Sequence, residues 1–180
     1  MPISDIEAYF RSYDRKSSDV YSQNGAEPSA KDVSAFEKEI GFPLPQEFRD
    51  YAVHPLGGVY MGVKEEIWPE PEPYSVGPFW SFLRGVLVYS LSSEAPDWLS
   101  MRDAWRIFSE DGHPELVPFL KVLGDADPYC FTTDGGIVIW RHETPDTPQA
   151  VDMSFSQVLI HELRELEQRT RWKIEGKDKS

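Results

Sequence analysis

Three residues that could act as nucleophile, base or proton donor stand near one predicted hairpin: Cys130, His142 and Glu143. A thiol activated by a histidine can attack a carbonyl, and a histidine beside a carboxylate can exchange protons. Reactive thiolates need an electropositive setting, however, and no basic residue stands within five positions of Cys130. We expect a buried structural thiol and a strand-end hydrogen bond at His142. A small-molecule-binding or hydrolytic protein that uses this trio is the less favoured alternative.

Two pairs of residues have the sequence spacing of metal ligands, but each pair is only part of a metal site. His161 and Glu165 stand one helical turn apart, which provides two ligands of a site that needs three or four. Asp125 and Asp127 resemble the start of a calcium loop that lacks its later glycine and glutamate. A solvated helix face and a polar turn are the simpler interpretations. Because phosphate-loop, hydrolase and zinc-protease motifs are also missing, we expect no catalytic activity, no metal and no cofactor.

The segment of residues 65–80, here called the acidic–aromatic segment, carries a different kind of chemistry. Prolines at positions 69, 71 and 73 enforce an extended backbone and exclude a helix. Tryptophan and tyrosine are frequent anchors of protein interfaces, and acidic groups attract a basic partner. A loop whose aromatic side chains fold back onto the core explains the same composition. The residues that we expect to contact a partner are Glu65, Glu66, Trp68, Glu70, Glu72, Tyr74 and Trp80.

The charge of the chain narrows the class of partner. There are 31 acidic against 18 basic residues, a formal net charge of −13, and the excess lies between two nearly neutral ends. Such a surface repels phosphates and anionic lipids, so direct binding to nucleic acid or to a membrane is not expected. The first ten residues contain no lysine or arginine, and no apolar run approaches the ~18 residues of a membrane span. We expect a cytoplasmic protein with a basic protein partner.

Helical spacing dominates both ends of the chain. Apolar residues recur three or four positions apart, which indicates helices with one buried face. Capping-box spacing opens the first, second and last of these segments at Ser4, Ser29 and Ser154, and Gly41 is the expected end of the second. The expected helices span residues 4–17, 29–40, 46–53, 93–108 and 154–170, with a polar connection over residues 18–28 and a charged tail over residues 171–180.

Strands are expected in the middle and the last third. Asp134, Gly135 and Gly136 favour a tight hairpin between the last two strands, with Phe131, Val138 and Trp140 among the buried residues. Pro118 indicates an edge or a bulge. The expected strands span residues 59–63, 85–91, 116–122, 129–132 and 137–142. The fold class is therefore a single α+β domain over residues 1–170, with a mainly antiparallel sheet and helices packed around it.

The combination of these features resembles a known family. The opening signature of the SUKH superfamily is similar to the run Phe36-Glu37-Lys38-Glu39-Ile40-Gly41-Phe42-Pro43-Leu44-Pro45, followed by Phe48, Tyr51 and Gly57-Gly58. The central hairpin and closing helix of that family resemble Gly124-Asp125, Tyr129-Cys130-Phe131, Val138, Trp140, His142 and Ser154-Phe155 through Leu163. The resemblance covers roughly residues 30–166, although residues 64–115 align poorly.

This Smi/Knr-like group contains fungal cell-wall regulators and bacterial immunity proteins. The resemblance implies an α+β scaffold without a catalytic group, and its bacterial members mostly neutralise toxins, commonly nucleases, by direct binding. A short single-domain chain favours the bacterial branch. We therefore expect a non-catalytic immunity protein that binds a basic toxin domain. A regulatory or scaffold protein of the Smi/Knr type is the alternative, and the gene neighbourhood would distinguish the two.

Overall fold

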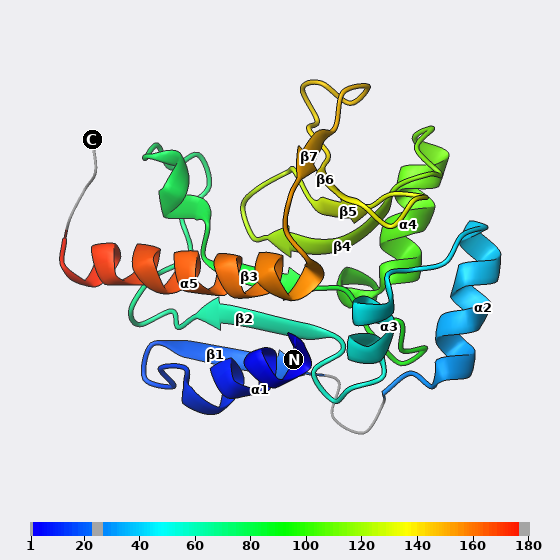
Figure 1. Ribbon diagram of the computed structural model, residues 1–180. Coiled ribbons are helices and arrows are strands. Elements are labelled where there is room, and N and C mark those ends of the chain that lie inside the picture. The colour runs from blue at the N-terminus through cyan, green and yellow to red at the C-terminus, as the bar shows by residue number, and fades with distance from the viewer. Residues whose placement is uncertain (1, 23–26, 177–180) are drawn as a thin grey trace.

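A computed structural model describes residues 2–22 and 27–176. Seven strands form one open antiparallel sheet in which every strand pairs with the next along the chain, so that β1 and β7 are the edges (Figure 1). The strands are β1 (Ser18–Ser22), β2 (Val59–Val63), β3 (Gly85–Val88), β4 (Val117–Val122), β5 (Tyr129–Phe131), β6 (Ile137–Ile139) and β7 (Gln149–Val151). The chain is a single α+β domain, as the sequence predicts.

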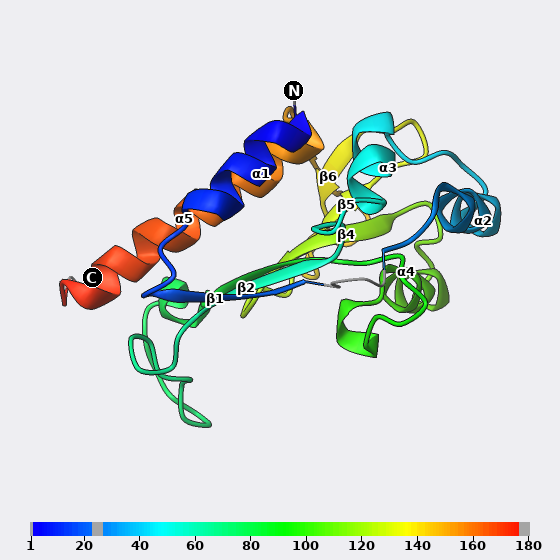
Figure 2. The same ribbon diagram turned by 90° about the horizontal axis from the view of Figure 1, so that it is seen from below.

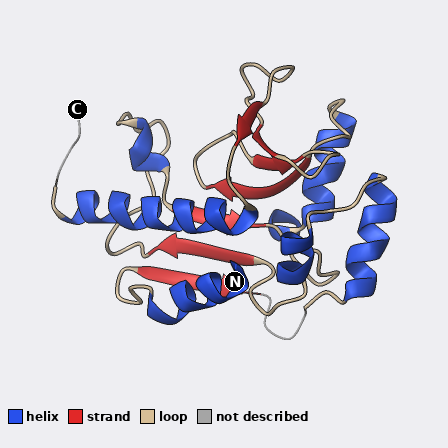
Figure 3. Cartoon of the chain, viewed as in Figure 1, coloured by secondary structure: helices blue, strands red, loops and turns tan. Residues whose placement is uncertain are grey.

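The helices lie on both sides of this sheet (Figures 2 and 3). The helices α1 and α5 lie side by side, run in the same direction, and cover one face of the sheet together with α3. On the other side α4 packs beside β4, and α2 stands next to α4. The helices are α1 (Pro2–Ser12), α2 (Ala30–Ile40), α3 (Gln46–Ala52), α4 (Met101–Glu110) and α5 (Phe155–Ile174), with the short 3-10 helices η1 (Phe79–Phe82) and η2 (Asp97–Leu99). None of the described helices combines the length and apolar character that crossing a bilayer requires.

The main hydrophobic core fills the space between the sheet and the layer of α1, α3 and α5. Phe48 of α3 contacts Phe131 of β5 and Phe155 of α5, with ring centroids 5.0 and 5.1 Å apart. Phe119 of β4 stacks on Phe131 at 4.0 Å. All four rings are almost completely removed from solvent, and such aromatic clusters contribute strongly to core stability. This cluster fixes α3 and α5 against the sheet.

Local signals set several boundaries as the sequence predicts. Ser29 and Asp32 form a complete capping box at the start of α2, and Gly41 ends that helix in the left-handed conformation with φ 88°. Ser154 and Gln157 cap α5 in the same way. The register of β4 against β5 shifts just after Pro118, which confirms the predicted bulge.

Several expected boundaries were wrong. The first helix spans Pro2–Ser12 rather than residues 4–17, and residues 18–22 of the expected polar connection form β1; residues 23–26 lie outside the described residues. The strands expected over residues 85–91 and 137–142 end early, at Val88 and Ile139. The expected helix over residues 93–108 is split into η2 and α4, because the backbone of Ser90 exchanges hydrogen bonds with Leu99 and Met101. The last helix continues to Ile174, inside the expected tail, and residues 177–180 lie outside the described residues.

The hairpin of β5 and β6 forms as predicted, but it lies toward one edge of the sheet. Phe131 is fully buried, whereas Val138 and Trp140 are only half-buried, which corrects the expected core. The reason for Val138 is the register: it pairs with Cys130, one position away from the buried Phe131–Ile137 pair, so its side chain lies on the face of the sheet opposite the main core. The sequence also did not indicate the edge strand β7, whose exposed Ala150 pairs with Val138. Trp140 packs beside Phe108 of α4 at 5.0 Å, outside the main core.

Candidate protein-binding surface

The acidic–aromatic segment connects β2 to β3 and projects from the body of the protein (Figure 2). Its base is fixed by Trp68, which is 1% exposed. The indole N–H of Trp68 donates to the carbonyl of Ser81 at 3.1 Å, and Nε of Arg84 donates to the carbonyl of Trp68 at 3.0 Å. Trp68 therefore holds the segment in place and is not accessible to a partner.

A row of three tryptophans continues this attachment toward α5. The ring of Trp80 lies 5.9 Å from that of Trp68 and 5.9 Å from that of Trp172, both in edge-to-face geometry. Trp80 is accordingly half-buried. Trp68 and Trp80, two of the seven residues expected to contact a partner, thus fold back onto the protein. This agrees with the alternative interpretation of the segment as a loop whose aromatic side chains pack on the core.

Glu65 also stabilises the base of the segment. One of its carboxylate oxygens accepts from Arg84 at 2.8 Å, and the other accepts from the backbone N–H of Glu70 at 2.9 Å. These bonds, above all the one from Arg84, lower the pKa of the Glu65 carboxyl group. The carboxylate is therefore charged and oriented at neutral pH.

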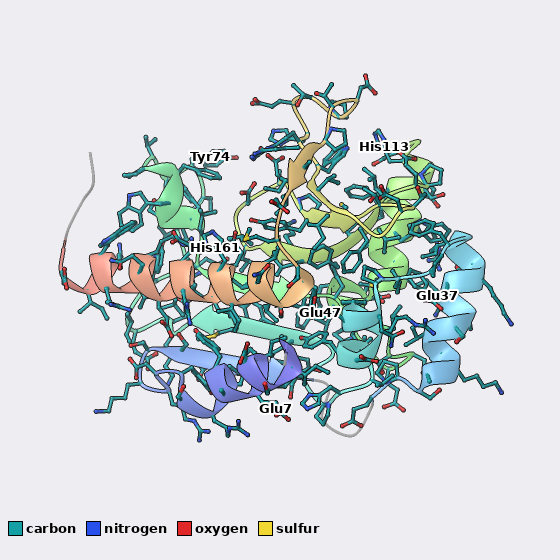
Figure 4. All side chains as sticks on the ribbon, in the orientation of Figure 1. Glu7, Glu37, Glu47, Tyr74, His113 and His161 are labelled. Atoms are coloured by element: carbon teal, nitrogen blue, oxygen red, sulfur yellow. The ribbon has the colours of Figure 1, made fainter. Side chains whose placement is uncertain are left out.

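The outer part of the segment is open to solvent. Tyr74 is fully exposed and adopts the left-handed conformation with φ 67°, which is unfavourable for a bulky residue. Figure 4 shows it on the projecting part of the chain, away from α5. Glu66, Glu70 and Glu72 are exposed as well. The segment therefore presents an aromatic side chain and three carboxylates on a fixed base, which is an arrangement suited to binding a basic protein.

A second exposed aromatic group lies on the sheet and was not predicted. Trp98 of η2 stands 5.7 Å from the ring of Tyr21 in β1 and 6.0 Å from that of Tyr60 in β2. Trp98 and Tyr21 are 52% and 48% exposed. The sequence offers little signal for this group, because residues 18–22 lack a clear apolar pattern and Trp98 falls within the helix expected over residues 93–108, which the structure divides into η2 and α4.

The candidate catalytic trio does not come together as a site. Cys130 is fully buried, its Sγ lies 3.9 Å from the carbonyl oxygen of Pro128, and burial raises the pKa of its thiol. His142 and Glu143 are exposed. Nδ1 of His142 is 2.6 Å from Oδ1 of Asp127 instead of facing the thiol. The geometry therefore favours a structural role for Cys130 and His142.

Asp127 is the centre of a small polar network at the base of the β5–β6 hairpin. Its carboxylate accepts from the backbone N–H of His142 at 3.1 Å and from Arg141 at 3.1 Å. Burial alone would raise the pKa of Asp127, but the bonds from His142 and Arg141 outweigh it and lower the pKa. The backbone N–H of Asp127 donates to Asp125 at 3.0 Å, so this stretch is a polar turn, as expected.

His161 is exposed on α5 one turn before the half-buried Glu165 (Figure 4). Within the described ranges, no three or more histidine, cysteine, aspartate or glutamate side chains are arranged to hold a metal ion.

The fold thus defines a single α+β domain with an open seven-stranded antiparallel sheet, and its most conspicuous surface features are an acidic projection and an exposed aromatic group. Residues 27–161 match the model of the SMI1 / KNR4 family (SUKH-1), which is most of the chain, and the protein belongs to that family. SUKH proteins are commonly immunity proteins of polymorphic toxin systems and are generally non-catalytic. No curated protein matches the sequence closely enough to count as a relative.

Proposed function

We propose that this protein is a non-catalytic immunity protein that binds and neutralises a bacterial toxin domain with a basic surface. Family membership supports the general role. The observation that carries the specific proposal is the exposure of the acidic–aromatic segment, whose side chains of Tyr74, Glu70 and Glu72 are all open to solvent.

The attachment of the segment supports a binding role. Ordering a flexible loop at an interface costs free energy, and a loop that is already fixed avoids most of that cost. Here Trp68, Trp80 and the ion pair of Glu65 with Arg84 hold the base in one conformation, and prolines stiffen the outer part. The projection therefore keeps its aromatic and acidic side chains available in a fixed arrangement.

The charge supports a basic partner, and a nuclease domain fits this requirement. A nuclease must present cationic groups to the phosphates of its substrate. An acidic protein that covers those groups competes directly with the nucleic acid. Its field also accelerates the encounter, by ~10–10³ for strongly complementary surfaces.

The test is protection of cells from the toxin domain that the neighbouring gene encodes. Cells that express this domain should survive when the wild-type protein is co-expressed. Tyr74→Ala combined with Glu70→Lys should protect less well. Glu110→Lys, an exposed substitution at the C-terminal end of α4, is the control for the change of charge. A neighbouring gene whose product is not toxic, or a toxin against which the wild type gives no protection, would contradict the proposal and favour a regulatory or scaffold role.

A further inference from the structure

The register of β1 and β2 divides their side chains between two faces of the sheet. Val20 pairs with Met61, whose sulfur lies 3.8 Å from the phenol oxygen of Tyr9 in α1, so these side chains face the main core. Tyr21 pairs with Tyr60 in the adjacent register. Because side chains alternate along a strand, both tyrosines lie on the opposite face. Figure 2 shows no α-helix lying across this face of β1 and β2, in contrast to the face that α1 and α5 cover.

Two glycines shape this face. A Cβ atom on Gly62 would collide with the phenol of Tyr60, and one on Gly85 would lie 2.8 Å from its ring. The ring of Tyr60 therefore lies flat along the sheet, across the two glycines. Trp98 meets it edge-on, with an interplanar angle of 83°. Tyr21, Tyr60 and Trp98, here called the aromatic sheet face, form a low platform that is open to a partner.

Carboxylates border this platform. Asp19 pairs in register with Gly62, Asp97 precedes Trp98, and both are exposed. Burial raises the pKa of the Tyr60 phenol, the charge of Arg84 lowers it, and the charges of Glu65 and Glu70 raise it. These three residues form one group, in which Glu65 binds Arg84 at 2.8 Å and accepts from the backbone N–H of Glu70 at 2.9 Å.

The cations at this border are already paired with carboxylates. Nζ of Lys64 lies 3.7 Å from Asp19, and Arg84 binds Glu65 at 2.8 Å. Among the described residues, neither Glu70 nor Asp97 has an ion-pair partner. The border therefore has an excess of negative charge that a cationic ligand would complement.

We propose that the aromatic sheet face is a contact surface for arginine and lysine side chains of the toxin domain. Tryptophan and tyrosine rings attract cations over their faces, and a guanidinium group also stacks on them. Carboxylates at the border would pair with the same cations. This inference rests on the proposed function and extends its interface from the acidic–aromatic segment onto the sheet. Self-association through this face is disfavoured, because two copies with a net charge of −13 each repel one another.

The experiment measures the affinity of the purified toxin domain encoded by the neighbouring gene, in a catalytically inactive form, for the wild type and for surface variants. Trp98→Ala and Tyr21→Thr should each weaken binding by about 30-fold, the effect of losing an interface anchor. Threonine is chosen because it preserves the strand. The control is Ile107→Ala, which removes a 59% exposed side chain from α4 and should change the affinity less than about twofold. Thermal unfolding confirms that the variants are folded.

Each other outcome overturns the inference in a recognisable way. Wild-type affinity in both Trp98→Ala and Tyr21→Thr would exclude this face from the interface and leave the proposed function standing. A wild-type protein that does not bind the toxin domain at all would overturn both. A wild-type dimer that Trp98→Ala converts to a monomer would identify the face as a contact between copies of the chain.

Discussion

The phenol of Tyr129 donates a hydrogen bond to Oε1 of Glu162 at 2.7 Å, and both side chains are 8% exposed. The bond joins β5 to the middle of α5. Burial, followed by the bond to Glu162, raises the pKa of the Tyr129 phenol, so it remains a donor at neutral and moderately alkaline pH. A buried carboxylate is costly without a donor, which makes this pair important for the position of α5.

Removing the donor should therefore destabilise the fold. Tyr129→Phe keeps the ring but leaves Glu162 without its phenol partner, and we expect the free energy of unfolding to fall by roughly 1–3 kcal/mol. Urea denaturation at neutral pH measures this difference. Combining Tyr129→Phe with Glu162→Leu, which also removes the acceptor, should recover part of the loss. An unchanged stability in Tyr129→Phe would show that the bond contributes little.

Two aromatic residues of the acidic–aromatic segment should behave in opposite ways. Trp68→Ala removes a fully buried ring and should cost roughly 3–5 kcal/mol of stability. Tyr74→Ala removes a fully exposed ring and should change stability by less than about 0.5 kcal/mol. Chemical denaturation of the two variants side by side tests the assignment of one residue to attachment and the other to recognition. Equal effects would contradict it.

The Asp127–His142 pair should make part of the stability dependent on pH. The hydrogen bond to Asp127 raises the pKa of His142 above its unfolded value. The stabilisation is therefore fully present below the unfolded pKa of histidine and is lost as pH rises through the folded one. On the acid side it is lost as pH falls through the lowered pKa of Asp127.

The measurement is the difference in unfolding free energy between the wild type and His142→Ala across this range. The difference should be larger near about pH 5.5 than near about pH 8.5. His113, which lies 3.6 Å from Glu115, is a suitable comparison site for a second histidine substitution. A difference that does not vary with pH would mean that the protonated imidazole adds nothing to the pair.

Cys130 should be chemically silent in the folded protein. It is fully buried, so a reagent cannot reach it. Burial also raises the pKa of its thiol, which therefore stays protonated at neutral pH. A chromogenic disulfide reagent should react with it only after urea is added. Rapid labelling without denaturant would revive the hypothesis of a reactive thiol at this position.

The boundaries of α2 could be predicted to within a residue, because its capping residues lie in or next to the helix itself. Ser29 and Asp32 determine where α2 starts, and Gly41 determines where it ends; all three residues lie within or directly next to the helix. By contrast, β1 is a short edge strand whose partner begins at Val59, far along the chain. Its polar, half-exposed residues carry little apolar pattern, so the sequence predicts a connection over residues 18–22.

In the candidate protein-binding surface, too, some features follow from the local sequence and others depend on tertiary contacts. Composition and proline spacing could single out the acidic–aromatic segment, but not which of its rings are exposed. Trp80 is covered because Trp172 arrives from the other end of the chain. Trp98 is exposed because the backbone around Ser100 pairs with Ser90 and interrupts the expected helix. Such contacts depend on tertiary structure and leave no local signal.

The most direct test of an acidic binding surface is the association rate with the toxin domain encoded by the neighbouring gene, measured by stopped flow across ionic strength. We expect the rate constant to fall by about tenfold or more between about 20 mM and about 500 mM salt. Glu70→Lys should slow association at low salt, whereas Glu110→Lys, with the same change of net charge, should slow it less. An association rate that does not respond to salt, with both variants equal to the wild type, would contradict the account.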